Sequence, residues 1–210
     1  MRHPITILCA LVFSACAADG GENDAVSHEH EESAQSTQLR QGHTDEIVDA
    51  LGSALAASRK YDDIAVAETE GYVAVSKCES SADGTMGVHY GHPDKMAAPP
   101  DVGNPPLLLY LPKPEGQQLV AIEYFQPILQ DGEPYFGSPS EPPREDFLPK
   151  NPPELFDGQP FDGPMAGHNP EMPWHYDQHV WLYADNPDGL FAMWNSAIHC
   201  PPEAEPERAP

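Results

Sequence analysis

The fold of this chain is decided by one apolar stretch, Gln118-Leu119-Val120-Ala121-Ile122-Glu123-Tyr124-Phe125. Its β-branched and aromatic residues favour a β-strand. Shorter runs of the same kind, separated by proline and glycine, predict further strands over residues 72–76, 86–90, 107–111 and 175–183, with a short one near Phe191. The centre of the chain is therefore expected to be an antiparallel sheet.

The residues before this sheet predict helices. Thr44 is a good N-cap, and Asp45 and Glu46 suit the first turn of a helix. Apolar residues then recur at helical spacing as far as residue 59, and a second helical segment over 61–70 is expected to end at Gly71. The sequence thus predicts an α+β fold, with an N-terminal helical segment packed on a small antiparallel β-barrel or sandwich that has long Pro-rich loops.

The segment over residues 127–173 is rich in proline and shows little periodicity. A connection of this length in a compact domain is usually functional or disordered. Its apolar side chains favour an ordered loop that lies across the sheet as a lid, and they are Phe136, Phe147, Leu155, Phe156, Phe161 and Met165.

The N-terminus has the order of an export signal, with basic Arg2, an apolar run over 5–13 and then Ser14-Ala15-Cys16. The run is too short to cross a bilayer, which takes about 20 apolar residues. A small pair followed by cysteine resembles the lipobox of bacterial lipoproteins, so Cys16 is predicted to carry acyl chains and to anchor the protein in a lipid bilayer. Ala17 after the cysteine implies, by the same resemblance, sorting to the outer membrane. Cleavage after Ala17 and secretion is the alternative.

Four segments follow from this reading. Residues 1–16 are the signal peptide, and 17–43 form an acidic tether with too few large apolar residues to bury a core. Residues 44–200 form a single core domain, and 201–210 a disordered tail. The tether histidines His28, His30 and His43 lie among glutamates and are expected to be solvated.

Export also bears on the cysteines. Removal of the signal leaves Cys16, Cys78 and Cys200, and if Cys16 is acylated, the other two form the only possible pair. An oxidising compartment favours a disulfide over a pair of thiolate metal ligands, which is the alternative.

The chain is strongly acidic, with 34 acidic and 10 basic residues and a formal net charge of −24. Nucleic acids and anionic lipid surfaces need a positive face, so neither is expected as a partner. Cations are the natural counterpart, although an acidic surface also simply keeps an exported protein soluble.

The densest group of possible metal ligands lies in residues 173–183, which contain His175, Asp177 and His179. Alternate residues of a strand share one face. Residues two apart on that face are about 6.6 Å apart and residues four apart about 13 Å, so His175 and His179 would strain to bind one ion.

Two other strands each place a polar residue among apolar neighbours, namely His89 and Glu123. A buried carboxylate without a partner is costly, so Glu123 demands a metal, a histidine or an arginine. The sequence predicts one transition-metal ion, zinc, copper or iron, bound by residues from His89, His175, His179, Glu123 and Asp177, with His168 on the Pro-rich loop as a further candidate. If the protein is an enzyme, Glu123 or Asp177 is the expected general base.

The alternative is a non-catalytic structural or partner-binding envelope lipoprotein in which the same residues form a structural polar network. A carbohydrate-binding module is a third possibility, and it would need a row of exposed aromatic side chains. The sequence has no Gly-x-Ser-x-Gly, phosphate-binding glycine loop, His-Glu-x-x-His or Cys-x-x-Cys motif, so the reactions that depend on these motifs find no support.

Four motifs carry a resemblance over most of the core: Met86-Gly87-Val88-His89-Tyr90, Glu123-Tyr124-Phe125, Phe161-Asp162-Gly163-Pro164-Met165 and His175-Tyr176-Asp177-Gln178-His179-Val180-Trp181. The chain resembles a group of exported bacterial proteins that share these motifs and to which no reaction is assigned. The resemblance implies export and selects no function.

Overall fold

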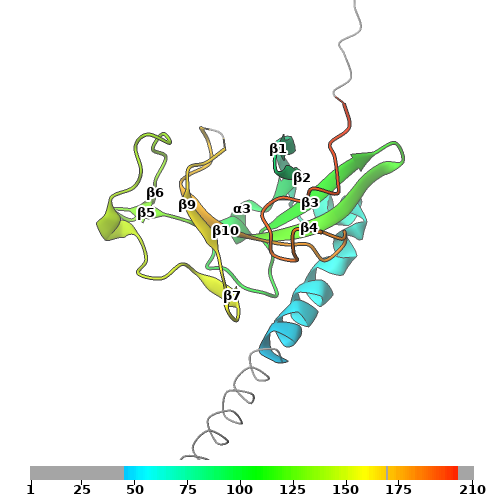
Figure 1. Ribbon diagram of the computed structural model, residues 1–210, viewed down its shortest axis with the longest axis horizontal. Coiled ribbons are helices and arrows are strands. Elements are labelled where there is room, and N and C mark those ends of the chain that lie inside the picture. Colours follow the sequence, from blue (N-terminus) through cyan, green and yellow to red (C-terminus); the bar gives the residue numbers. More distant parts are fainter. Residues whose placement is uncertain (1–44, 169, 203–210) are drawn as a thin grey trace, which may run out of the picture. The chain divides into compact units, whose positions relative to one another are not determined.

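A computed structural model describes residues 45–168 and 170–202 of the chain (Figure 1). The predicted signal peptide, the tether and the tail from residue 203 lie outside these residues. No helix within the described part is long and apolar enough to cross a membrane.

The core has the expected α+β fold, with an N-terminal helix followed by one main antiparallel sheet of six strands that curves as a half-barrel. The strands lie in the order β1-β2-β3-β4-β10-β9. Their bounds are Val73–Ser81 (β1), Gly84–Gly91 (β2), Leu107–Lys113 (β3), Gly116–Pro127 (β4), Asp162–Met165 (β9) and His175–Val180 (β10). The four strands predicted before residue 127 are confirmed and are longer than expected.

Residues 45–58 form the predicted N-terminal helix. The second predicted helical segment is divided, with the 3-10 helix η1 over Arg59–Asp62 and α2 over Ile64–Thr69. Asp63 makes the division, because its side chain accepts a hydrogen bond from the Ala65 N–H and caps α2. Gly71 ends this segment as expected, with a φ of 101° that glycine adopts easily.

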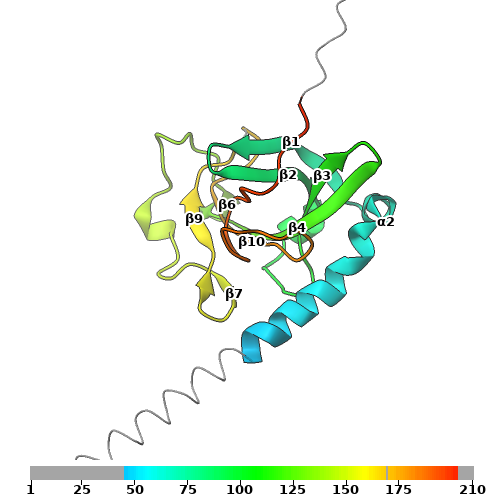
Figure 2. The same cartoon turned by 45° about the vertical axis from the view of Figure 1, so that its right-hand side comes forward.

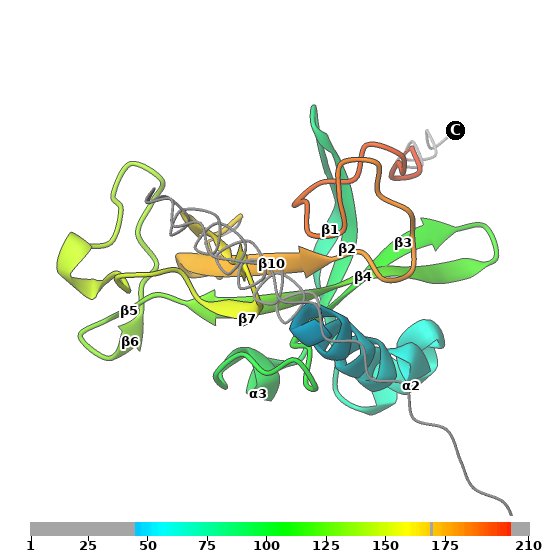
Figure 3. The same cartoon turned by 60° about the horizontal axis from the view of Figure 1, so that its bottom comes forward.

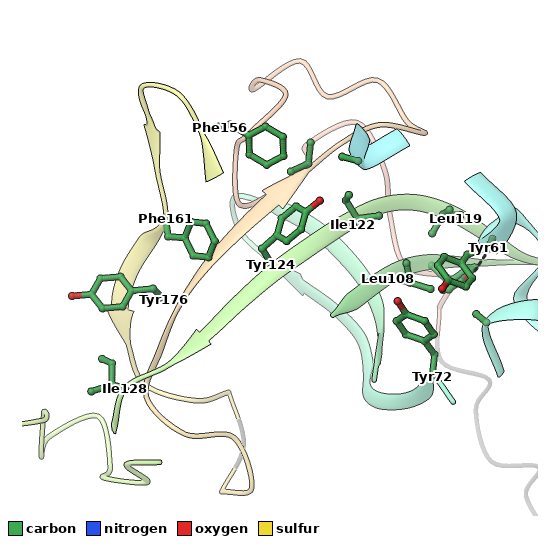
Figure 4. Packing of buried hydrophobic residues seen from close by; sticks show 14 of the residues in the cluster. Tyr61, Tyr72, Leu108, Leu119, Ile122, Tyr124, Ile128, Phe156, Phe161 and Tyr176 are labelled. Carbon is green, nitrogen blue, oxygen red and sulfur yellow. Dashed lines mark hydrogen bonds between the residues drawn. The ribbon is translucent and has the colours of Figure 1, made fainter. Parts of the chain in front are cut away.

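One face of the sheet is apolar and rich in tyrosine (Figure 4). Its buried strand residues include Leu108, Tyr110, Ile122 and Tyr124, and Ala54 of the N-terminal helix packs against this cluster. The buried tyrosine hydroxyls have partners: Tyr72 donates to the Pro105 carbonyl at 2.6 Å, Tyr110 to the Tyr61 carbonyl at 2.6 Å, and Tyr124 to the Val102 carbonyl at 2.7 Å. We call this side the tyrosine face.

The opposite face carries a smaller apolar cluster of Met86, Leu109, Leu111, Val120, Ala121 and Trp181. Figure 3 shows the N-terminal helix and the C-terminal segment on opposite sides of the sheet. Met193, Trp194 and Ile198 of that segment pack on the smaller cluster. This second side, which we call the histidine face, also carries the predicted ligands.

The C-terminal segment departs from prediction in two ways. Strand β10 ends at Val180 rather than near 183, because the backbone N–H of Trp181 donates to the Leu190 carbonyl at 2.9 Å and the chain leaves the ladder. The short strand expected near Phe191 does not form. The segment is fastened instead by a bridge between Thr85 and Asn195 and by the predicted Cys78–Cys200 disulfide.

The described residues of the Pro-rich segment are ordered, as predicted (Figure 2). It contains two short hairpins, Leu129–Gln130 with Glu133–Pro134 (β5 and β6) and Glu154–Phe156 with Gln159–Pro160 (β7 and β8), and the edge strand β9, which the sequence did not predict. Short helices lie at Pro93–Met96 (α3) and Glu145–Phe147 (η2). Phe156 and Phe161 are buried in the tyrosine face, whereas Phe136 is 55 % exposed and is not the expected anchor.

Candidate metal centre

Strand register brings three of the predicted ligands together. His179 on β10 lies directly opposite Glu123 on β4, and Leu107 on β3 lies opposite Glu123 from the other side. His89 on β2 pairs with Leu109 on β3. Leu109 is two residues from Leu107 and therefore lies on the same face of the sheet. Gly87 allows β2 to approach β3 this closely, since a Cβ there would lie 2.7 Å from the Tyr110 carbonyl oxygen.

The three side chains form a compact buried group. His89 Nε2 lies 3.3 Å from Glu123 Oε2, and His179 Nε2 lies 3.8 Å from the same oxygen. One ligand atom from each residue falls within 4.8 Å of the others, and each residue is at most 6 % exposed. Among the described residues this is the one set of three such side chains with that spacing.

The polar atoms around this group are not satisfied within the protein. In the described part of the chain, five buried atoms of four neighbouring residues have no hydrogen-bond partner: Glu123 Oε2, His175 Nε2, Asp177 Oδ1, His179 Nδ1 and His179 Nε2. Each buried polar atom without a partner costs about 1–3 kcal/mol, and charged groups cost more. A cation bound among them would remove much of this cost.

Strand β1 orients His89. Ser76 Oγ accepts a hydrogen bond from the backbone N–H of His89 at 3.0 Å and donates its own proton to the Lys77 carbonyl at 2.7 Å. With its proton used, Ser76 Oγ can only accept from His89 Nδ1, which lies 3.0 Å away. The proton of His89 is therefore on Nδ1, and the Nε2 lone pair faces Glu123.

The protonation states suit metal binding. Burial, which the Glu79 carboxylate offsets only in part, lowers the pKa of His89 to about 4. Burial also lowers the pKa of His179. Both imidazoles are then neutral near pH 7, which is the form that coordinates a metal. Burial, followed by the negative charge of Asp177, raises the pKa of Glu123 well above its usual value.

The other predicted ligands lie beside this group rather than within it. His175 Nδ1 donates to the Pro173 carbonyl at 2.9 Å, and its Nε2 is 3.5 Å from Asp177 Oδ2. His168 Nδ1 is 2.9 Å from Glu79 Oε2. As the strand spacing predicted, His175 and His179 do not belong to the same set of ligands.

Sequence reasoning missed Ser76 and Glu79. Glu79 Oε1 lies 4.0 Å from His89 Nδ1, and its other oxygen contacts His168, so it links two histidines. Both residues are on β1, whose pairing with β2 is irregular between Ala74 and Cys78 and again between Glu79 and Ser80. On a regular strand, residues three apart point to opposite faces, so alternation could not have predicted that both residues contact the histidines; the irregular pairing makes this possible.

A pocket of about 330 Å³ opens beside the centre. His89, Glu123 and His168 contribute its polar wall, and Met96, Leu107 and Met172 contribute apolar wall. Two imidazoles and a carboxylate are a donor set that suits zinc, copper or iron, and a site with three protein ligands keeps a position open for a further ligand. A small molecule in this pocket would be next to that position.

No protein-family model, curated protein or solved structure matches this chain. The resemblance to exported proteins with the same four motifs therefore stays a prediction.

Proposed function

We propose that this protein is an exported lipoprotein that binds a transition-metal ion through His89, Glu123 and His179. The pocket beside these residues would give the ion access to a small-molecule ligand. Such an ion supplies a Lewis acid or an exchangeable coordination position. The arrangement supports metal binding, and nothing in it selects one reaction.

One observation carries the proposal. Four adjacent residues of the histidine face, all at most 1 % exposed, hold five polar atoms without partners in the described structure. In a purely structural polar network these atoms would bond to one another or to nearby backbone groups, as the tyrosine hydroxyls do on the other face. A cation is the simplest group that satisfies facing nitrogen lone pairs and carboxylate oxygens together.

The test is the metal content of the complete chain, purified after its own processing and without a polyhistidine tag. Elemental mass spectrometry is applied to the protein as isolated and after reconstitution with Zn²⁺. The tether histidines His28, His30 and His43 are replaced by asparagine in every sample, so that they contribute no metal.

The decisive comparison is His179→Asn against His199→Asn. His199 is exposed in the C-terminal segment and serves as a matched control. We expect stoichiometric metal in the parent and in His199→Asn, and the loss of one ion per chain in a still-folded His179→Asn variant. No bound metal in any sample, even after reconstitution, would overturn the proposal and favour a structural polar network.

The proposed lipid anchor at Cys16 rests on a separate observation and is tested separately. The order of Ser14, Ala15 and Cys16 after an apolar run supports acylation at Cys16 and a membrane-bound protein facing the periplasm or the cell surface. Cys16→Ser should move the protein from the membrane fraction to the soluble fraction, and the N-terminal peptide of the parent should carry the mass of acyl chains. An unmodified N-terminus at Ala18 in the parent would instead show simple secretion.

A further inference from the structure

A second pair of buried groups remains when an ion is placed among His89, Glu123 and His179. His175 is 0 % exposed and Asp177 is 1 % exposed. In the described structure His175 Nε2 and Asp177 Oδ1 have no hydrogen-bond partner. The first ion cannot take His175, because His175 and His179 are four positions apart on one strand, about 13 Å between their Cα atoms.

The tautomer of His175 follows from its other nitrogen. The Pro173 carbonyl can only accept, so Nδ1, at 2.9 Å, carries the proton. His175 Nε2 lies 3.5 Å from Asp177 Oδ2, at the outer limit of a hydrogen bond. A cation beside His175 Nε2 and the Asp177 carboxylate would satisfy both groups.

A further carboxylate increases this demand. Asp162 on β9 lies directly opposite Asp177 on β10. Like charges at directly opposed positions of neighbouring strands destabilise a sheet. A cation next to Asp177 would turn this repulsion between the two carboxylates into a net attraction.

His168 is placed to complete the second set. Its Nδ1 is held by Glu79 at 2.9 Å, which leaves Nε2 as its ligand atom, and its ring centroid is 6.1 Å from that of His175. The corresponding distance between His89 and His179 is 6.2 Å. With metal–nitrogen bonds of about 2.0–2.1 Å, two imidazoles on opposite sides of one ion have centroids roughly 6.4 Å apart, so both pairs are within reach of one ion and would draw closer together at a tetrahedral angle.

Glu79 lies near one histidine of each proposed set of ligands. One of its oxygens contacts His168, and the other lies 4.0 Å from Nδ1 of His89. A carboxylate that accepts from the far nitrogen of a ligating histidine fixes the ring and makes it a better ligand. Glu79 accepts in this way from His168, whereas Nδ1 of His89 donates to Ser76 and the Glu79 carboxylate lies beyond that contact.

We propose that the centre is dinuclear, with a second divalent transition-metal ion bound by His175, Asp177 and His168 beside the ion at His89, Glu123 and His179. This inference rests on the proposed function and adds a second site to it. This second set is wider than the first in the structure, so His168 has to move toward Asp177 as the ion binds, and its side chain, which is 32 % exposed, has room to do so.

The experiment counts ions in the complete processed chain with the tether histidines His28, His30 and His43 replaced by asparagine. Zn²⁺ is titrated by calorimetry, and bound zinc is measured by elemental mass spectrometry after desalting. The parent should bind two zinc ions per chain. His175→Asn and the nearly isosteric Asp177→Asn should each bind one, whereas His199→Asn should still bind two.

The outcomes separate the two proposals. One zinc in the parent and also in His175→Asn would overturn the second site and leave the proposed function standing. Two zinc ions in the parent and in both substituted proteins would place the second ion elsewhere and also overturn this inference. No zinc in the parent would overturn the proposed function itself. Far-ultraviolet circular dichroism verifies the fold of each variant, and the count in the parent does not depend on any variant.

Discussion

The two faces of strand β4 carry different kinds of buried side chain. Tyr124 and Glu123 are adjacent and both fully buried, at 0 % and 1 % exposure. Tyr124 points into the tyrosine face, where its hydroxyl donates to the Val102 carbonyl. Glu123 points into the histidine face, where Oε2 has no hydrogen-bond partner among the described residues. Alternation along a strand separates the two environments completely.

The difference indicates that the two faces have different roles. The buried tyrosine hydroxyls are paired within the protein, so the tyrosine face can fold without any ligand. On the histidine face, imidazole nitrogens and carboxylate oxygens stay unpaired on the strands of the sheet. Side chains held ready on a rigid element are what a preorganised metal site requires. We therefore expect substitutions in the apolar core of the tyrosine face to alter folding, and substitutions around the unpaired histidines and carboxylates of the histidine face to alter metal binding.

The largest effect on stability should come from the disulfide that fastens the C-terminal segment over the histidine face. Its cysteines are 122 residues apart, and the chain-entropy model gives a loss of about 5 kcal/mol for a loop of this size when Cys78 and Cys200 are both replaced by alanine. Urea denaturation of the metal-free proteins measures this change. A loss below about 1 kcal/mol would show that the bond contributes little to the core.

On the tyrosine face, Leu108→Ala should lower the free energy of unfolding by about 2–5 kcal/mol. Leu108 is 0 % exposed, and its truncation leaves a cavity in the main apolar cluster. The zinc affinity of the folded variant should stay within about twofold of the parent, because the side chain points away from the ligands. Loss of zinc from a folded Leu108→Ala protein would contradict the separation of the faces.

On the histidine face, Ser76→Ala should weaken zinc binding by about 10–100-fold, since partners of ligating histidines contribute on this scale. Ser76 holds Nδ1 of His89 and thereby directs Nε2 toward Glu123. Ser80→Ala, an exposed serine on the same strand, is the matched control. Equal affinities for the two variants, measured by competition with a chelator, would argue against this role of Ser76.

The smallest expected effect concerns the contact between Glu79 and His168. The Glu79 hydrogen bond raises the pKa of His168 despite partial burial. A raised histidine pKa stabilises the protein below the unfolded pKa, and this stabilisation is lost as pH rises through the folded pKa. Both side chains are partly exposed, so the contact contributes less than about 1 kcal/mol.

In metal-free protein, Glu79→Gln should lower the pKa of His168, which nuclear magnetic resonance titration can follow. Glu68→Gln is the control, because Glu68 is exposed on α2. An unchanged His168 pKa in Glu79→Gln would show that the contact does not persist in solution.

The sequence was sufficient for the fold class and for naming the residues of the candidate metal site, because both depend on local pattern. Alternation placed His175, Asp177 and His179 on one face, and the polar residues in apolar strands pointed to His89 and Glu123. It could not supply strand register, which decided that His179 rather than His175 meets Glu123. Ser76 and Glu79 were missed because bulges in β1 break the period, and β9 because glycine and proline fill its Asp162–Met165 sequence.

The most direct test of the metal centre is anomalous X-ray diffraction at the absorption edge of the metal that co-purifies or is reconstituted. We predict an anomalous peak about 2.0–2.3 Å from Nε2 of His89, an imidazole nitrogen of His179 and a carboxylate oxygen of Glu123. A second peak beside His175 and Asp177 would add the dinuclear arrangement. Crystals of metal-loaded protein with no peak at His89, Glu123 and His179 would contradict the account.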